Sequence, residues 1–192
     1  MESIKQKQQQ AIIELTKQFG LKNAMAAPRL TKVVVSAGFG SRRDKARAEL
    51  VCDRLSKITG QKVSPRQAKQ SIASFKLRQG EVIGAAATLR GPRMYGFLDK
   101  LVNVAIPRTR DFRGLSARGI DAMGNYTMGI KEHLIFPETA DEDVRDVFGF
   151  SVSIGTTSKS KEQAEALLRA LGFPFKTKDK EESQKVKKSK KK

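Results

Sequence analysis

The sequence has very few of the residues from which catalytic and metal centres are usually built. It contains one cysteine, one histidine and no tryptophan among 192 residues. The single Cys52 excludes an internal disulfide and is typical of a reducing, cytoplasmic setting. One cysteine and one histidine are also too few ligands for a zinc site. We therefore expect no metal and no cofactor.

Enzyme motifs are also missing. Gly38 and Gly40 begin a dinucleotide-binding pattern, but Arg43 stands where the third glycine is needed. The sequence has neither a Gly-Lys-Ser/Thr phosphate loop nor a Gly-x-Ser-x-Gly nucleophile turn. His133 has no second histidine with which to share a metal, so we interpret it as a structural or surface residue. The sequence predicts a protein that is not an enzyme.

Acidic residues and long apolar runs are scarce. No run of about 18 apolar residues occurs, and residues 1–20 lack a signal-peptide core, so we expect neither a membrane span nor secretion. The 38 Lys and Arg residues against 20 Asp and Glu give a net charge of +18. Such an excess repels itself and is typical of a protein whose charge a polyanion neutralises. We infer that the polyanion is nucleic acid.

Hydrophobic periodicity predicts an α+β fold. The clearest amphipathic helix opens at Gly91 and ends before Pro107, with its apolar residues at i, i+3, i+4, i+7, i+8 and i+11. Residues 61–80 have no regular pattern and are interpreted as a long irregular loop. Interleaved strands and helices with irregular connections predict a two-layer sandwich, in which helices cover one face of a mainly antiparallel sheet. The other predicted helices are 2–19, 41–60 and 160–171, and the predicted strands are 31–37, 82–90, 125–131 and 148–155.

The domain organisation follows from the same pattern. Residues 1–175 are predicted to form one α+β RNA-binding domain, because apolar periodicity continues to Phe175. Residues 176–192 are Lys-rich and have no apolar period, which predicts a disordered basic tail. Ser41 begins a capping-box-like sequence that predicts the start of the second helix.

The strongest candidate site is the decapeptide at residues 106–115. Arginine presents a permanent planar charge that matches phosphate bidentately. One aspartate among three arginines can hold one guanidinium and leave the others for an anionic partner, while Phe112 and Gly114 indicate a shaped loop. Its candidate residues are Arg108, Arg110, Asp111, Phe112 and Arg113.

The predicted sheet offers a second candidate surface. One side of its strands is apolar, and the other side carries small polar residues such as Ser36, Thr88, Ser151 and Ser153. A face of small polar groups on a basic protein could lie against a nucleic-acid backbone, as open sheets do in RNA-binding modules. A merely solvated face is the alternative.

The decapeptide, IPRTRDFRGL, resembles the signature of the bacterial family of large-subunit ribosomal protein five, which binds 5S rRNA. Further matches to this family are GQK at 60–62, FKLRQG at 75–80, TLRG at 88–91, GNYTMG at 124–129, IFPE at 135–138 and FPF at 173–175. The resemblance implies a relative of the ferredoxin-like fold, placed in the central protuberance with 5S rRNA, large-subunit rRNA and neighbouring ribosomal proteins as partners. It also implies contacts of the 61–80 loop with P-site tRNA, and contact with a head protein of the small subunit.

The family's contacts can be placed on this sequence. The resemblance implies 5S rRNA contacts at Ser36, Gly38, Gln61, Thr88 and Arg90. For the tRNA-facing loop it implies Arg66, Lys69, Lys76 and Arg78. Two positions depart from the family pattern: Ser36 stands where the family typically has Asn, and Gln70 where it usually has a basic residue.

Two other classes of function fit parts of the sequence. A free-standing regulatory RNA- or DNA-binding factor would also carry this charge and this tail. An enzyme acting on phosphorylated substrates would use Asp111 or His133 beside the arginines. The family motifs favour the ribosomal function over both.

Overall fold

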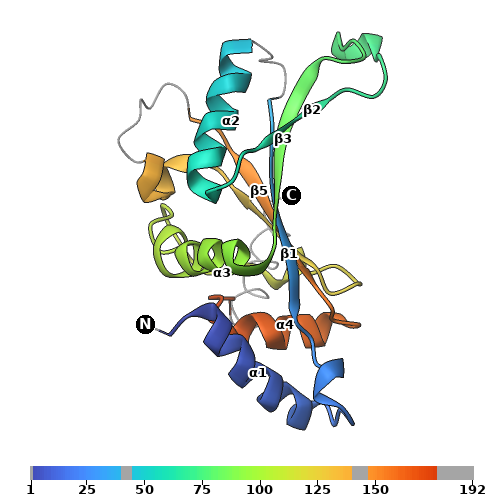
Figure 1. Cartoon of the computed structure of the whole chain (residues 1–192), viewed down its shortest axis with the longest axis vertical. Helices are drawn as coiled ribbons and strands as arrows, with labels where there is room; N and C mark the ends of the chain where they lie inside the picture. The colour runs from blue at the N-terminus through green and yellow to red at the C-terminus, as the bar shows by residue number, and fades with distance from the viewer. Residues whose placement is uncertain (1, 40–44, 140–146, 177–192) are drawn as a thin grey trace, which may run out of the picture.

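The computed structural model describes residues 2–39, 45–139 and 147–176 and contains one five-stranded sheet (Figure 1). The strand order is β2-β3-β1-β5-β4, and every neighbouring pair is antiparallel. The longest strand, β1, lies at the centre of the sheet. The strands are β1 (Leu30–Gly38), β2 (Ser64–Gln67), β3 (Val82–Leu89), β4 (Tyr126–Ile130) and β5 (Phe150–Thr156).

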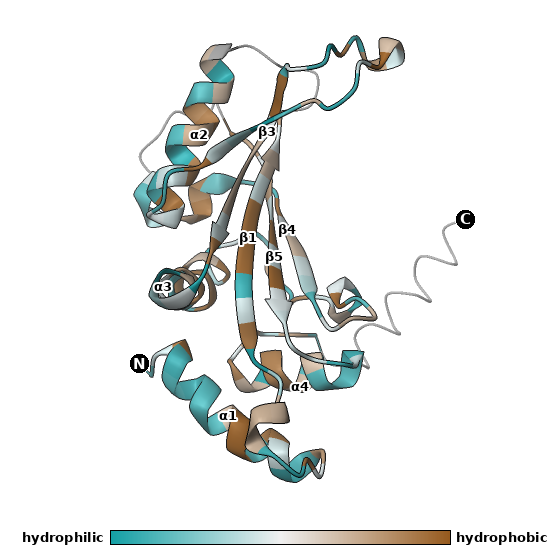
Figure 2. Cartoon of the chain, turned by 45° about the vertical axis from the view of Figure 1, so that its right-hand side comes forward, coloured by the Kyte–Doolittle hydropathy of each residue, from teal (hydrophilic) through white to brown (hydrophobic). Residues whose placement is uncertain are grey.

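The helices gather on one side of this sheet, as Figure 2 shows, so the predicted two-layer α+β sandwich is confirmed. Their bounds are α1 (Ile4–Gln18), α2 (Lys45–Thr59), α3 (Gly91–Lys100) and α4 (Lys161–Ala170). A π-helical turn, η3 (Leu101–Ala105), continues α3. The short 3-10 turns are η1 (Ala24–Ala26), η2 (Ala73–Phe75), η4 (Ala117–Gly119), η5 (His133–Ile135) and η6 (Pro137–Thr139). No helix in the described ranges is long and apolar enough to cross a bilayer.

The core lies between the helices and the inner face of the sheet. Val33 and Val35 of β1 are fully buried, and their cross-strand partners Leu89, Ile154 and Val152 are buried with them. The predicted apolar stripe of α3 is buried too, and it continues through η3 into Ile106. Alternation along each strand therefore leaves the opposite face of the sheet without a helical cover.

The interpretation of residues 61–80 as an irregular loop is wrong in part. Residues 64–67 form β2, which pairs with β3, and the two strands extend beyond the sheet as a hairpin (Figure 1). The hairpin tip closes through hydrogen bonds of 3.0 and 3.1 Å between the backbones of Ile72 and Leu77. All four residues of β2 are exposed, so no apolar alternation marked the strand.

Two predictions concern residues outside the described ranges. One is the helix start at Ser41, and the other is the basic tail predicted for residues 176–192, of which the structure describes only residue 176.

Candidate nucleic-acid interface

Small side chains cover the open face of the sheet. The pairing register places Ser64, Ala86, Ser36, Ser151 and Gly129 in one line that crosses all five strands. At a strand spacing of about 4.8 Å, the line is about 19 Å long. None of its side chains is larger than serine, so a ligand backbone can approach the sheet closely.

Hydroxyl pairs keep this face ordered. The Ser36 and Ser151 Oγ atoms lie 2.9 Å apart, and the Thr127 Oγ1 and Ser153 Oγ atoms lie 3.1 Å apart. Because each hydroxyl has one proton and two lone pairs, it keeps hydrogen-bonding capacity for a ligand after this pairing. The face therefore presents polar groups in defined positions.

Cations border the same face. Lys32, Arg66 and Arg90 are exposed, and strand alternation places all three on the open side of β1, β2 and the end of β3. Arg66 stands opposite Gly84, where an added Cβ would lie 2.8 Å from the carbonyl oxygen of Ala37. The glycine thus permits close strand packing beside the arginine.

The five residues predicted to contact 5S rRNA come together on this side of the molecule. Ser36 and Thr88 lie on the open face, and Gly38 ends β1 opposite Gly84. Gln61 donates from Nε2 to the Thr88 carbonyl at 3.3 Å, which fixes it at the edge of the sheet. Arg90 directly follows β3 and precedes α3. These five residues are separated by up to 54 positions in sequence, but the fold gathers them.

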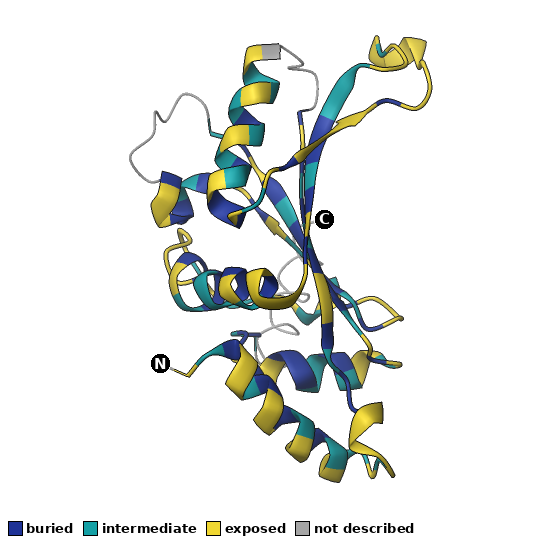
Figure 3. Ribbon diagram, viewed as in Figure 1, coloured by how far each residue is buried: buried dark blue, intermediate teal, exposed yellow. Residues whose placement is uncertain are grey.

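The predicted tRNA-facing residues lie on the hairpin. Arg66 belongs to β2, whereas the three remaining cations are exposed near the tip (Figure 3). The tip has a defined shape: Lys76 adopts a left-handed φ of 50°, and the Gln79 N–H donates to Ser71 Oγ at 3.0 Å. It therefore presents positive charge well away from the sheet. We call Lys69, Lys76 and Arg78 the hairpin cations.

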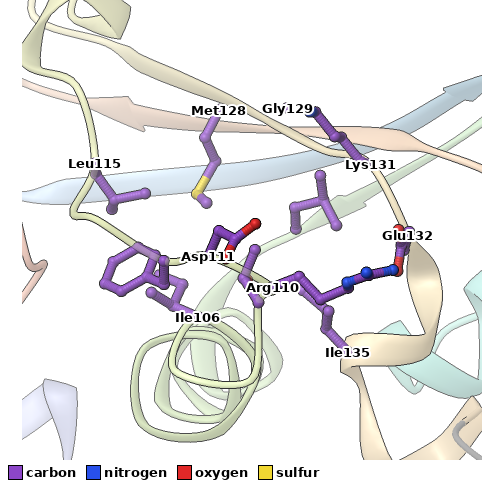
Figure 4. Close-up of a pocket in the computed structure, with 12 residues that line it drawn as sticks. Ile106, Arg110, Asp111, Leu115, Met128, Gly129, Lys131, Glu132 and Ile135 are labelled. Carbon is purple, nitrogen blue, oxygen red and sulfur yellow. The ribbon is translucent and has the colours of Figure 1, made fainter. Parts of the chain in front are cut away.

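The arginine loop, residues 106–115, is anchored as predicted. Phe112 is half-buried against the core, and Gly114 adopts a φ of +93°. Arg108, Arg110 and Arg113 are exposed. The expectation that Asp111 holds one of these guanidinium groups is wrong: within the described ranges Asp111 forms no ion pair. Asp111 adopts a positive φ of 52°, and Figure 4 shows its carboxylate inside a pocket beside β4, while the Arg110 side chain extends toward Glu132.

The C-terminal segment holds the arginine loop in place, a contact that the sequence did not reveal. The Leu115 N–H donates to the Pro174 carbonyl at 2.8 Å, and the Lys176 N–H donates to the Leu115 carbonyl at 2.9 Å. Phe175 packs edge-on against Tyr126, with ring centroids 5.2 Å apart. The only sequence signal was the apolar FPF triplet just before the Lys-rich tail.

Comparison with known proteins identifies the family to which this chain belongs. A family model described as ribosomal protein L5 matches residues 23–78, and a second model, which describes the C-terminus of the same ribosomal family, matches residues 82–175. The large ribosomal subunit protein uL5 of Cupriavidus metallidurans is 49% identical over 168 residues, which cover 87% of this chain and 93% of that protein. The chain belongs to the ribosomal protein L5 family. The uL5 protein of Rippkaea orientalis is 47% identical over 176 residues, covering 91% of this chain and 98% of that protein.

Membership of the L5 family gives the broad function of the chain. It is a structural, RNA-binding component of the large ribosomal subunit and takes part in translation, so its location is the ribosome in the cytoplasm. It is not an enzyme, as the sequence predicted.

The remaining candidate groups of this L5-family chain have structural roles. His133 is fully buried, stacks on Phe148 with centroids 4.3 Å apart, and accepts the Phe148 N–H at Nδ1 over 3.4 Å. Cys52 is half-buried on α2, and burial raises the pKa of its thiol. No cluster of three or more His, Cys, Asp or Glu residues suited to a metal occurs within the described ranges.

Proposed function

We propose that this chain recognises 5S rRNA in the central protuberance with the open face of its sheet. The observation that carries the proposal is the line of small side chains across all five strands. The contacts are assigned to Ser36, Gly38, Gln61, Thr88 and Arg90, which share that side of the molecule.

The chemistry of this face suits an RNA backbone. RNA helices display 2′-hydroxyls and phosphates along a wide, shallow minor groove, which a flat surface can approach. Serine and threonine hydroxyls can donate to phosphate and exchange hydrogen bonds with the 2′-hydroxyl. Lys32 and Arg90 supply sequence-independent attraction at the border of the face. Arg66, which the family resemblance places among the tRNA-facing residues, borders the same face and adds to this attraction. Position is thus set by the hydroxyls, and a large part of the affinity by the cations.

The hairpin and the arginine loop are assigned to other partners. The hairpin projects its cations away from the sheet, so we assign it to a separate RNA, P-site tRNA. The exposed arginines of the arginine loop are assigned to large-subunit rRNA. The family resemblance further supports contact with a head protein of the small subunit. The Lys-rich sequence 176–192 adds salt-sensitive affinity without specificity.

The test is the binding of the purified chain to 5S rRNA and to a length-matched control RNA across a range of salt concentrations. Charge-driven binding falls steeply with salt and treats the two RNAs alike. We expect a preference for 5S rRNA of about a hundredfold, or roughly 2.7 kcal/mol, that persists at high salt. Equal affinity for both RNAs at every salt concentration would refute the proposal.

A further inference from the structure

A cavity of about 460 Å³ lies between the arginine loop and the edge strand β4. Figure 4 shows the cavity bounded by Ile106 and Leu115 on one side and by Met128, Lys131 and Glu132 on the other. Its volume falls in the range of small-molecule sites, about 300–1,000 Å³. It opens on the helical side of the sheet, because the partner of Met128 across the strands is the buried Val152. We call it the β4 pocket; it lies at the edge of the sheet and shares Gly129 with the line across the open face.

The lining of the β4 pocket is amphipathic. Its floor is apolar and consists of Ile106, Phe112, Leu115, Met128, Ile130 and Ile135. Its rim is charged and consists of Arg110, Asp111, Lys131 and Glu132. A flat, weakly hydrated ring can pack on such a floor, and a rim that carries both signs of charge can bind a ligand that has both hydrogen-bond donors and an anionic group.

The surrounding charge favours a phosphate-bearing ligand. Arg108, Arg110 and Arg113 are exposed, and none of them forms an ion pair within the described ranges. Arginine binds phosphate bidentately, and its guanidinium also stacks on nucleobases. The two carboxylates repel phosphate and accept hydrogen bonds. Figure 4 shows the Arg110 side chain extending toward Glu132 and the Asp111 carboxylate inside the pocket, so the rim offers a guanidinium and carboxylate acceptors at neighbouring positions.

We propose that the β4 pocket binds a guanine base unstacked from an RNA strand, with its phosphate on the arginine loop. A carboxylate only accepts hydrogen bonds, and guanine is the one standard base whose Watson–Crick edge presents two adjacent N–H donors. Unstacked bases are the usual targets of sequence-specific RNA recognition, by stacking and by hydrogen bonds to this edge. This site goes beyond the proposed 5S rRNA contact, because the pocket opens on the helical side of the sheet.

A methionine methyl group gives a direct readout. The chain has five methionines, of which Met128 lines the pocket and Met94 of α3 is buried in the core. Chain labelled with ¹³C at its methionine methyls would be titrated with GMP, AMP, CMP and UMP and followed by NMR. We expect GMP to shift the Met128 signal but not the Met94 signal, and to bind at least about fivefold more tightly than AMP.

Removing the carboxylates separates recognition of the base from attraction by charge. Asp111→Asn preserves the left-handed backbone, which asparagine tolerates, and Glu132→Gln is nearly isosteric. Each change should lower the preference for GMP over AMP, and the double variant should abolish it, although both raise the positive charge. Glu14→Gln on the exposed face of α1 adds the same charge far from the pocket and should leave the preference unchanged.

Two outcomes would overturn the proposal. One is an equal Met128 shift from all four nucleotides, and the other is no shift from any of them. In the second case, a shift produced by N-acetyl-phenylalaninamide would assign the pocket to an apolar side chain of a protein partner. The affinity of the carboxylate variants for 5S rRNA would be measured in parallel. This affinity tests the proposed contact of the open face separately from the β4 pocket.

Discussion

Ala86 lies in the middle of the open face, between Ser64 and Ser36 in the line that crosses the sheet. Replacing it with lysine or with glutamate places a long side chain where an RNA backbone would rest. Because Ala86 is on the uncovered side of β3, either substitution should change the free energy of unfolding by less than about 1 kcal/mol. A loss of RNA binding would then report on the contact itself rather than on the fold.

The size of that loss follows from the hydroxyls beside Ala86. A hydrogen bond to a charged phosphate contributes about 1.5–3 kcal/mol. A side chain that holds the RNA away from Ser64 and Ser36 removes at least two such bonds, or about 3 kcal/mol. This corresponds to roughly 150-fold weaker binding of 5S rRNA. The added positive charge of the lysine recovers only a small part of this loss, because exposed charge pairs contribute about 1 kcal/mol or less.

The test depends on whether Ala86→Lys weakens or strengthens the binding of 5S rRNA. Binding of 5S rRNA by fluorescence anisotropy should weaken for both Ala86→Lys and Ala86→Glu. The same pair of changes at Gln9, on the exposed face of α1, gives the control: Gln9→Lys should strengthen binding slightly and Gln9→Glu should weaken it slightly. If Ala86→Lys binds 5S rRNA as well as or better than the unchanged chain, the face contributes charge alone and the argument from shape is refuted.

Three further predictions concern the hairpin, a turn glycine and a buried tyrosine. Replacing the hairpin cations by glutamine should lower the salt dependence of tRNA binding by reconstituted subunits by about one unit per cation and leave 5S rRNA affinity intact; unchanged tRNA binding would contradict the assignment. Gly124→Ala should cost about 2 kcal/mol or more in chemical denaturation, because φ is +78° and the new Cβ would lie 2.6 Å from Ser158 Cβ. Gly129→Ala, with nothing within 4 Å, is the neutral control. Burial raises the pKa of Tyr126 from 10.0 to about 12, so the stability contributed by its neutral phenol is complete below pH 10 and is lost as the pH rises toward 12. The denaturation midpoint of Tyr126→Phe should not fall in this way as the pH rises from 10 to 12. An identical fall in the variant would show that other groups cause it.

Apolar pattern alone predicted most of the framework. Val33 and Val35 became the buried centre of β1, with the partly exposed Val34 on the opposite face, and the stripe of α3 became the helical side of the core. These elements are visible in the sequence because one face of each is buried, and burial imposes a period of about 2 or 3.6 residues. The grouping of the 5S rRNA candidates came from the family resemblance, since no local pattern connects Gln61 with Thr88.

Elements without a buried face were not predictable in this way. β2 has the sequence Ser-Pro-Arg-Gln, is exposed throughout, and is held by backbone pairing to β3. Proline is tolerated there because β2 is an edge strand. The π-helical turn η3 also left no compositional signal: it consists of one change of hydrogen-bond register, in which the Ile106 N–H donates to the Leu101 carbonyl at 2.9 Å.

The β4 pocket and the anchor of the arginine loop depend on contacts between distant segments. The pocket joins the arginine loop to the end of β4, and the anchor joins Leu115 to Pro174 and Lys176. Local sequence carries no information about either pairing. The arginines could be singled out from the sequence as candidate binding residues, but the absence of an ion pair between them and Asp111 within the described ranges could not be predicted.

The most direct test of the central claim is a structure of this chain bound to 5S rRNA, free or within the large subunit. The account predicts that the RNA backbone lies along the open face, with the Ser36 and Ser151 hydroxyls within about 3.5 Å of phosphate or ribose oxygens. A structure in which 5S rRNA lies against the helical side, and the open face is bare or covered by protein, would contradict it.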